Sequence, residues 1–114
     1  MTDVFIYDAV RTPRGKGREG GALNGLTPLD LQKTLIRALL ERTGLDAGRI
    51  DDLILGCVTQ VGEQGGNIAK VAALYAGLPA SVSSITVNRY CSSGLDACNF
   101  AAMKIATGMD ELVL

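Results

Sequence analysis

The sequence predicts an α/β domain built on a parallel sheet. Short apolar runs typical of buried strands alternate with segments of helical period, in the order β-α-β-α-β-α-β. Hydrophobic residues make up 47% of the 114 residues but aromatic residues only 4%, which suits close-packed helices and sheets better than a β-sandwich. Strands that alternate with helices imply right-handed crossovers, so we expect functional side chains beyond the carboxyl ends of the strands.

Composition and charge argue against several classes of function. The net charge of −1 gives no electrostatic reason to bind nucleic acid or a membrane surface. No stretch approaches the roughly 18–20 apolar residues that span a bilayer, and the first residues lack the pattern of a secretory signal. Three cysteines without a CxxC pair favour reduced thiols. We therefore expect a cytoplasmic protein with no membrane span and no nucleic-acid partner, and we identify no metal ligands.

The first expected element is a strand over residues 4–10, whose nearly continuous apolar run is typical of burial on both faces. A loop with five glycines and four basic residues follows over residues 11–26. Residues 15–20 match GxGxxG, but a dinucleotide fingerprint needs its third glycine to open a helix, and helix signals begin only at Thr27. We interpret this stretch as a basic surface loop.

The next two elements have clear boundaries. Thr27 as N-cap, Pro28 at the first helical position and Asp30 in the first turn predict a helix that Gly44 ends. A second buried strand is expected over residues 53–58, in which Cys57 serves as a small hydrophobic residue. The glycine-rich residues 59–66 then form a loop, and Asn67 caps a helix through Tyr75. The polar side chains of this loop have two interpretations that stay open, contacts with a site or partner chain, or simple turn residues. These side chains are Gln60, Glu63 and Gln64.

The stretch of greatest interest lies at residues 83–98. The β-branched residues Ile85 and Val87 predict a short strand, and a long helix follows, running to about Thr107 and closed by Gly108. The turn between them places Cys91 where helix N–H groups are unsatisfied and the dipole favours an anion by about 0.3–1 kcal/mol. Cys91 is therefore a candidate nucleophile. A nearby base or cation would be needed as well, the chain has no histidine, and a buried structural cysteine is the alternative.

The helix after Cys91 is apolar on nearly its whole circumference, which is typical of a helix buried on all sides. One small sheet cannot cover it, so a second layer is expected from outside this chain, with Cys98 in the core. Residues 111–114 end the chain on an apolar run that indicates the start of a buried strand. We therefore expect the chain to be the front part of a longer protein.

The sequence VNRYCSSGLDA at residues 87–97 resembles the nucleophilic loop of the thiolase family, V-N-R/Q-x-C-G/S/A-S-G-L-x-A. Residues 8–16, 54–58 and 62–69 resemble the family's opening strand and turn, its I-L-G-x-V strand and its G-x-x-G-x-N-x-A-R loop. The resemblance implies a thiolase-like fold of layers α-β-α-β-α, of which residues 1–114 would be an incomplete N-terminal domain without the loop domain and the C-terminal half. Degradative 3-ketoacyl-CoA thiolases, especially β-subunits of fatty-acid oxidation complexes, are most similar.

The resemblance implies a ping-pong acyl transfer in fatty-acid β-oxidation. Cys91 would attack the 3-keto group of a 3-ketoacyl-CoA, release acetyl-CoA and pass the acyl group to a second coenzyme A. The family's activating histidine and second catalytic cysteine match no position here, and neither Cys57 nor Cys98 corresponds to that cysteine. Coenzyme A would be a substrate, its binding residues are not identified, and no bound cofactor is expected. A polypeptide of residues 1–114 alone is expected to be inactive.

Two other functions and several partners follow from the same resemblance. A biosynthetic thiolase that makes acetoacetyl-CoA is one alternative, and a non-catalytic thiolase-like protein that binds lipids or assembles with partners is another. Family members are dimers or tetramers, so residues 83–88 would pair with their twin in a second copy. A hydratase/dehydrogenase α-subunit is a further possible partner.

Overall fold

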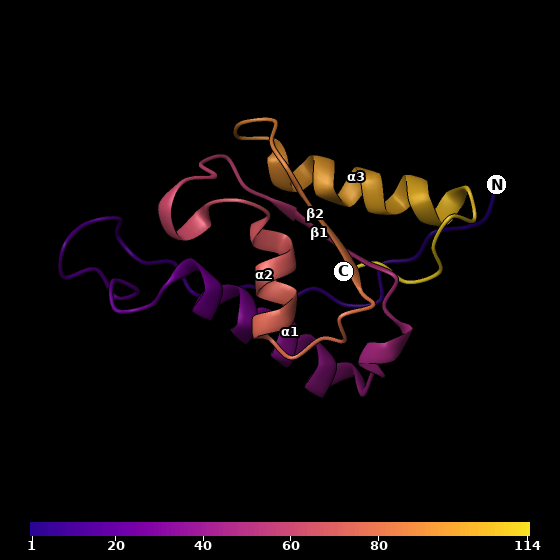
Figure 1. Ribbon diagram of the computed structural model, residues 1–114, viewed down its shortest axis with the longest axis horizontal. Helices are drawn as coiled ribbons and strands as arrows, with labels where there is room; N and C mark the ends of the chain where they lie inside the picture. Colours follow the sequence, from indigo (N-terminus) through magenta and orange to yellow (C-terminus); the bar gives the residue numbers. More distant parts are fainter.

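The computed structural model describes residues 1–114. A parallel sheet of two strands, β1 (Asp52–Gly56) and β2 (Ser83–Val87), forms its centre. Helix α3 (Ser93–Ala106) packs on one face of the sheet, and α2 (Ile68–Tyr75) packs on the other, with α1 (Pro28–Thr43) against α2 (Figure 1). Two single 3-10 turns, η1 (Ala47–Arg49) and η2 (Gly62–Gln64), lie in the connections. The α/β class is therefore confirmed.

The two strands run in register from Asp52 opposite Ser83 to Gly56 opposite Val87, and α2 connects them as a crossover. Strand alternation divides the side chains of β1 between the two faces. Leu53 belongs to the core cluster on the α2 side, whereas Asp52 and Ile54 face α3. The sheet therefore presents one face to α2 and the other to α3.

Local capping chemistry sets the helix ends where the sequence predicts them. At α1, Asp30 N donates to Thr27 Oγ1 at 3.1 Å and Thr27 N donates to Asp30 Oδ2 at 3.0 Å, a complete capping box. The helix ends at Gly44, whose φ of 66° is the left-handed conformation that glycine adopts without strain. At α2, Asn67 Oδ1 accepts from Lys70 N at 3.4 Å, while its Nδ2 donates to the Ser84 carbonyl of β2 at 2.9 Å. Asn67 thus joins a helix to the sheet.

The core lies between α1, α2 and β1. Its nine buried residues centre on fully buried Ala69, Ala72, Ala73 and Val82. Alanines on one face of α2 let the helix approach the sheet closely, and the leucines and isoleucines of α1 and β1 fill the remaining space.

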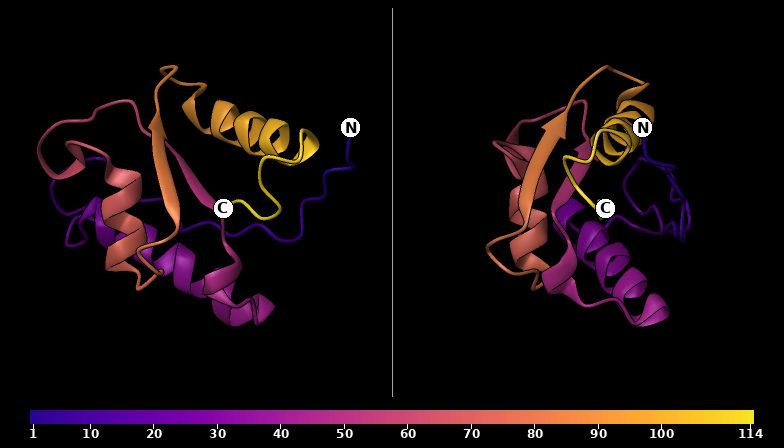
Figure 2. Two further views of the ribbon diagram at one scale, coloured as in Figure 1. Left: turned by 45° about the vertical axis from the view of Figure 1, so that its right-hand side comes forward. Right: turned by 90° about the vertical axis from the view of Figure 1, so that its right-hand side faces the viewer.

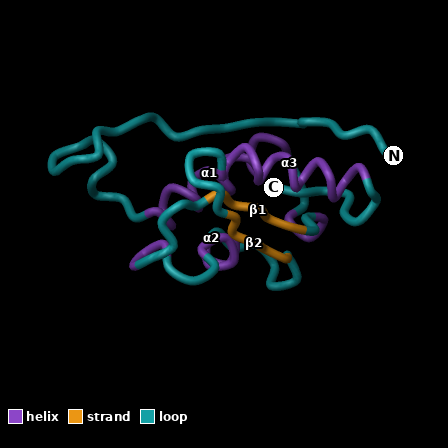
Figure 3. The backbone as a smooth tube through the Cα atoms, turned by 90° about the horizontal axis from the view of Figure 1, so that it is seen from above, coloured by secondary structure: helices purple, strands orange, loops and turns teal.

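Residues 4–10 differ from the prediction, because they form no strand. The segment is extended but pairs with no other strand, and most of its side chains are exposed, Ile6 at 90%. Figure 3 shows this segment running past α3 and α1 as one long stretch. Near the start of the chain, Thr2 N donates to the carbonyl of Ala106 at the end of α3, at 3.0 Å. One edge of β1 pairs with β2, and the other accepts the last residues of the chain, so neither edge is open to residues 4–10.

The expected final strand is present only as its beginning. Val113 forms an isolated parallel bridge with Asp52, supported by Leu114 N donating to Asp52 O at 3.0 Å and by Ile54 N donating to Leu114 O at 2.9 Å. Asp51 Oδ2 accepts the backbone N–H groups of Glu111 at 2.8 Å and Leu112 at 3.0 Å, and these bonds lower the pKa of Asp51. The predicted element order β-α-β-α-β-α-β is therefore present in its middle elements. Its first strand is unpaired and its last strand is incomplete.

The glycine motif in the basic loop at residues 11–26 does not open a helix. Gly20 (φ 74°) leads into further turns, and α1 begins only at Pro28, so the interpretation of GxGxxG as a surface loop is confirmed. In Figure 1 this loop projects at the far left and leads into the start of α1, apart from the loop that follows β2. A loop that followed a paired first strand would open at the same edge of the sheet as the loop after β2. Residues 11–26 do not, because the segment before them does not join the sheet.

None of the helices has both the length and the apolar character that crossing a membrane requires.

Candidate functional site

Cys91 lies in the short loop that joins β2 to α3, at the top of both views in Figure 2. Its thiol is free and exposed, two residues before Ser93, the first residue of the helix. No backbone carbonyl accepts the N–H groups of Gly94 and Leu95 in the first turn. These free N–H groups and the helix dipole favour negative charge at this end of α3. The predicted junction of strand, cysteine and helix is confirmed.

The residue before Cys91 has a strained backbone. Tyr90 has φ of 47°, and no other residue apart from glycine has a positive φ. A side chain with a Cβ pays about 1–2 kcal/mol in this conformation, so neighbouring contacts must hold it. The kink reverses the chain direction and presents Cys91 at the start of α3.

Two polar side chains hold the loop around Tyr90. Asn88 Oδ1 accepts from Tyr90 N at 2.8 Å, and Asn88 Nδ2 donates to Val58 O at 3.1 Å in the loop after β1. Ser93 Oγ accepts from Arg89 N at 2.9 Å and donates to Tyr90 O at 2.6 Å. The Asn88 bond to Val58 also shows that the loops after β1 and β2 lie side by side at the carboxyl ends of the strands.

Glycine at position 56 lets the start of α3 rest on the end of β1. A Cβ built on Gly56 would lie 2.5 Å from the backbone C of Ser93 and 2.6 Å from Gly94 N. Contacts under 3.0 Å with backbone atoms cannot be relieved by a side-chain rotation. Gly56 therefore fixes the height of the first turn of α3, and with it the height of Cys91, above the sheet.

Arg89 does not supply a free cation to the thiol. Its guanidinium pairs with Asp96 in the first turn of α3, and this carboxylate raises the pKa of Arg89. An arginine that is paired with a carboxylate offers less field to a neighbouring thiolate than a free one does. The helix end is thus the main source of positive potential that these residues provide beside Cys91.

The other two cysteines have different environments. Cys57 is buried at the end of β1, as predicted for a structural residue. Cys98 is exposed on α3, so its expected place in the core is wrong for this structure. The reason is that the sheet covers only one side of α3, whose other side also exposes Leu95.

The polar residues of the loop after β1 hold that loop together. Gln60 Nε2 donates to Gly66 O at 3.2 Å, and Gln64 Nε2 donates to Thr59 O at 3.0 Å. Both amides are thus engaged within the loop, and Glu63 is exposed in η2. This arrangement favours the interpretation of Gln60 and Gln64 as turn residues.

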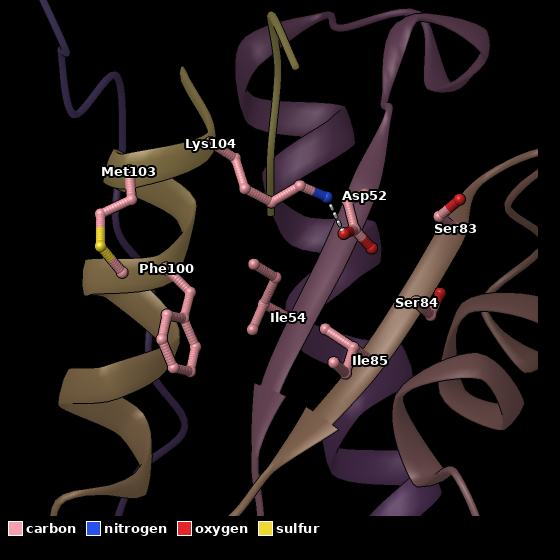
Figure 4. Close-up of a pocket in the computed structure, with 8 residues that line it drawn as sticks. All are labelled: Asp52, Ile54, Ser83, Ser84, Ile85, Phe100, Met103 and Lys104. Carbon is pink, nitrogen blue, oxygen red and sulfur yellow. Dashed lines mark hydrogen bonds and ion pairs between the residues drawn. The ribbon is translucent and has the colours of Figure 1, made fainter. Parts of the chain in front are cut away.

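A cleft of about 510 Å³ separates α3 from the sheet. Figure 4 shows Phe100 and Met103 of α3 opposite Ile54 and Ile85 of the two strands. At one end, Lys104 bonds to Asp52, and Asp110 Oδ2 lies 2.6 Å from its Nζ as an ion pair without hydrogen-bond alignment. Eight residues line the cleft: Asp52, Ile54, Ser83, Ser84, Ile85, Phe100, Met103 and Lys104.

Reasoning from sequence missed the two residues that shape the loop. Asn88 stands two positions before Tyr90, the spacing at which an asparagine side chain accepts a backbone N–H in a turn. That signal was available. Ser93 had no comparable signal, because its two bonds depend on the kink at Tyr90.

Comparison with known proteins finds relatives along the whole chain. A sequence model described as the N-terminal domain of thiolase matches residues 4–114. The chain is 51% identical over 115 residues to a beta-ketoadipyl-CoA thiolase of Escherichia coli, covering 100% of this chain and 28% of that protein. It is 44% identical to a steroid 3-ketoacyl-CoA thiolase of Mycobacterium tuberculosis, with the same two coverages. A 3-ketoacyl-CoA thiolase of Serratia proteamaculans is 49% identical over 95% of this chain and 28% of its own length.

A solved structure supports the same relationship. The crystal structure of the Bacillus anthracis acetyl-CoA acetyltransferase aligns with a TM-score of 0.76 at 39% identity, covering 82% of this chain and 24% of that one. The predicted thiolase-like fold is therefore confirmed. The chain spans 28% of the length of the curated relatives that it matches.

Proposed function

We propose, from the premise that this chain belongs to the thiolase family, that Cys91 is the nucleophile of a thiolytic acyl transfer from 3-ketoacyl-CoA. The observation that carries the proposal is the exposed Cys91 thiol at the start of α3, behind a strained turn, within a matched N-terminal thiolase domain. Buried structural cysteines show neither the exposure nor the helix end. The alternative of a buried small residue therefore loses its support.

The proposed reaction has two halves. The Cys91 thiolate adds to the 3-keto carbon, the bond between C2 and C3 breaks, and the C2 carbanion takes a proton to become acetyl-CoA. The acyl group is then a thioester on Cys91. The thiol of a second coenzyme A loses its proton and attacks that thioester, which releases the shortened acyl-CoA and restores Cys91.

The residues described here supply only part of this chemistry. They supply Cys91 itself and the start of α3, where the free N–H groups of Gly94 and Leu95 and the helix dipole give a positive potential. No histidine is present in the chain, so a histidine that activates Cys91 and a second cysteine that handles the proton at C2 would come from other segments of the protein. Coenzyme A is proposed as a substrate, with no bound cofactor. A polypeptide of residues 1–114 alone is accordingly expected to lack activity.

A homodimer or tetramer, with pairing through β2, is part of the proposal. The outer edge of β2 pairs with no strand of this chain, and an edge strand is a ready template for a second one. A twin copy of β2 would extend the sheet there and lie beside the Cys91 loop. A hydratase/dehydrogenase α-subunit and a cytoplasmic location complete the proposal for a role in fatty-acid oxidation.

A biosynthetic acetyl-CoA acetyltransferase is the second candidate, and the name of the similar Bacillus anthracis structure favours it. The curated relatives are named for beta-ketoadipyl-CoA, steroid 3-ketoacyl-CoA and 3-ketoacyl-CoA substrates. Comparing kcat/KM for acetoacetyl-CoA, 3-ketoadipyl-CoA and a long-chain 3-ketoacyl-CoA separates these substrates. A lipid-binding or assembly protein without catalysis would cleave none of them.

The test of the nucleophile uses the complete protein expressed from the reading frame that contains residues 1–114. Limiting iodoacetamide at neutral pH should label Cys91 first, and 3-ketoacyl-CoA without free coenzyme A should leave an acyl adduct on Cys91, both measured by mass spectrometry of peptides. Cys91→Ala should lower kcat/KM by about 10³-fold or more. Cys98→Ala is the matched control, because Cys98 is an exposed thiol on the same helix. Labelling of Cys57 or Cys98 ahead of Cys91 would overturn the assignment.

A further inference from the structure

The loop before Cys91 holds a conformation that its own residues do not favour. Tyr90 at φ 47° pays a strain of about 1–2 kcal/mol, and released from its contacts it would return to negative φ. Such a change rotates the peptide that leads directly into Cys91. The position of Cys91 just before the start of α3 therefore depends on the contacts that keep Tyr90 in place.

The Ser93 hydroxyl bonds to the backbone on both sides of the kink. It accepts the N–H of Arg89 at 2.9 Å on one side and donates to the carbonyl of Tyr90 at 2.6 Å on the other. The residue is 4% exposed, so water cannot readily replace these bonds when the hydroxyl is removed. Because Gly56 lies directly beneath the backbone of Ser93, the hydroxyl is also held at a fixed height above the sheet.

Asn88 holds the other end of the same turn. Its Oδ1 accepts the N–H of Tyr90 at 2.8 Å, and its Nδ2 donates to the Val58 carbonyl at 3.1 Å. The turn is thereby fixed to the loop after β1 as well as to α3. Tyr90 N–H and Tyr90 C=O are thus each bonded to a different side chain.

We propose that Ser93 and Asn88 are positioning residues for Cys91. They hold the Tyr90 kink and so keep Cys91 in the position from which its thiol reacts, two residues before the start of α3. This inference rests on the proposed function for its catalytic meaning, because it assumes that the reactivity of Cys91 is used. Ser92 provides the contrast, since its hydroxyl makes no capping hydrogen bond although it lies next to Cys91.

The experiment measures the rate of iodoacetamide labelling of Cys91 at neutral pH in the complete protein, with Cys98 of the same molecule as internal reference. Ser93→Ala should slow labelling of Cys91 by about three- to tenfold, because the loop loses the kink that presents the thiol. Labelling of Cys98 should not change. Ser92→Ala, the matched control, should stay within about twofold of the wild type.

Two further variants identify the kink as the cause. Asn88→Ala on the exposed loop should slow the labelling of Cys91 as well, and it keeps the test decisive where Ser93→Ala fails to fold. In a Tyr90→Asn background, the effect of Ser93→Ala should shrink, because asparagine adopts positive φ more readily than tyrosine does. Equal effects in both backgrounds, or labelling rates of Ser93→Ala and Asn88→Ala that match the rate of Ser92→Ala, would overturn the inference. Alkylation needs no substrate, so a protein that forms no acyl adduct refutes the proposed function while leaving this test intact.

Discussion

The two faces of the sheet are built from similar apolar residues but are covered very differently. On the α2 face, Ala69, Ala72 and Val82 are fully buried and α1 closes the layer from outside. On the α3 face, a cleft of about 510 Å³ separates helix and strands, and Met103 remains 51% exposed. We call these the closed face and the open face.

The difference shows what a helix pattern can specify. Helices α1 and α2 have one apolar side each, and these sides are buried against each other and against one face of the sheet. Helix α3 is apolar on most of its circumference, so a single sheet covers part of it and leaves Leu95 and Phe100 exposed. The open face nevertheless carries the Cys91 loop at one end, so the candidate site lies on the less covered side of the molecule.

The strongest test compares neighbouring residues of β1 on opposite faces. Leu53 (5% exposed) packs in the core of the closed face, and Ile54 (8% exposed) lines the cleft of the open face. Leu53→Ala should lower the free energy of unfolding by about 2–5 kcal/mol, because the closed core cannot collapse around the cavity. Ile54→Ala should cost less than half as much, because water already reaches the cleft. Urea unfolding followed by circular dichroism measures both, and equal losses would contradict the distinction between the faces.

The ion pairs at the edge of the open face give the next largest effect. Asp110 and Asp52 raise the pKa of Lys104. Lys104→Met should lower the free energy of unfolding by about 1–3 kcal/mol, because the buried carboxylate of Asp52 loses its partner.

The same residue predicts a pH dependence. A lysine whose pKa is raised in the folded state stabilises fully below about pH 10.5, where it titrates in the unfolded chain, and loses this contribution as the pH rises through the folded pKa. Stability measured from pH 9 to 12 should therefore fall more steeply for the wild type than for Lys104→Met. Parallel curves would show that the ion pairs contribute nothing.

The smallest expected effect lies at the outer boundary of the closed face. Tyr75 Oη donates to Asp30 Oδ1 at 3.0 Å between α2 and α1, and Lys33 Nζ lies 4.6 Å from the centre of the tyrosine ring. Tyr75→Phe should lower the free energy of unfolding by about 0.5 kcal/mol, because this bond is exposed to water and the ring remains in place. A loss above about 2 kcal/mol would contradict the expectation that the buried core, and not this exposed contact, stabilises the closed face.

Much of the closed face could be predicted from the sequence, because its signals act locally. Thr27, Asp30 and Gly44 determine the ends of α1 by bonds within one turn, and Asn67 does the same at α2. The junction that exposes Cys91 could also be predicted, from a strand pattern followed by small residues and a helix. The nucleophilic role of Cys91 stays a prediction.

The remaining features depend on distant neighbours. The apolar run at residues 4–10 indicates burial but says nothing of which strand edge is free, and both edges of β1 are already used. The burial of Cys98 depends on what covers the far side of α3. The kink at Tyr90 could not be predicted from the residue itself, because tyrosine disfavours positive φ. The kink depends on hydrogen bonds with the side chains of Ser93 and Asn88.

The extended residues 4–10 have a consequence for how the molecule behaves over time. The N–H groups of residues 4–7 donate to no protein acceptor, so their hydrogens should exchange with solvent almost as fast as in an unfolded chain. The amide hydrogens of α2 should exchange only when the closed face unfolds locally. Phe5, Ile6 and Tyr7 are at the same time good strand formers with exposed side chains. We therefore expect this segment to respond to protein concentration, because an exposed strand-forming segment is a template for pairing with a second molecule.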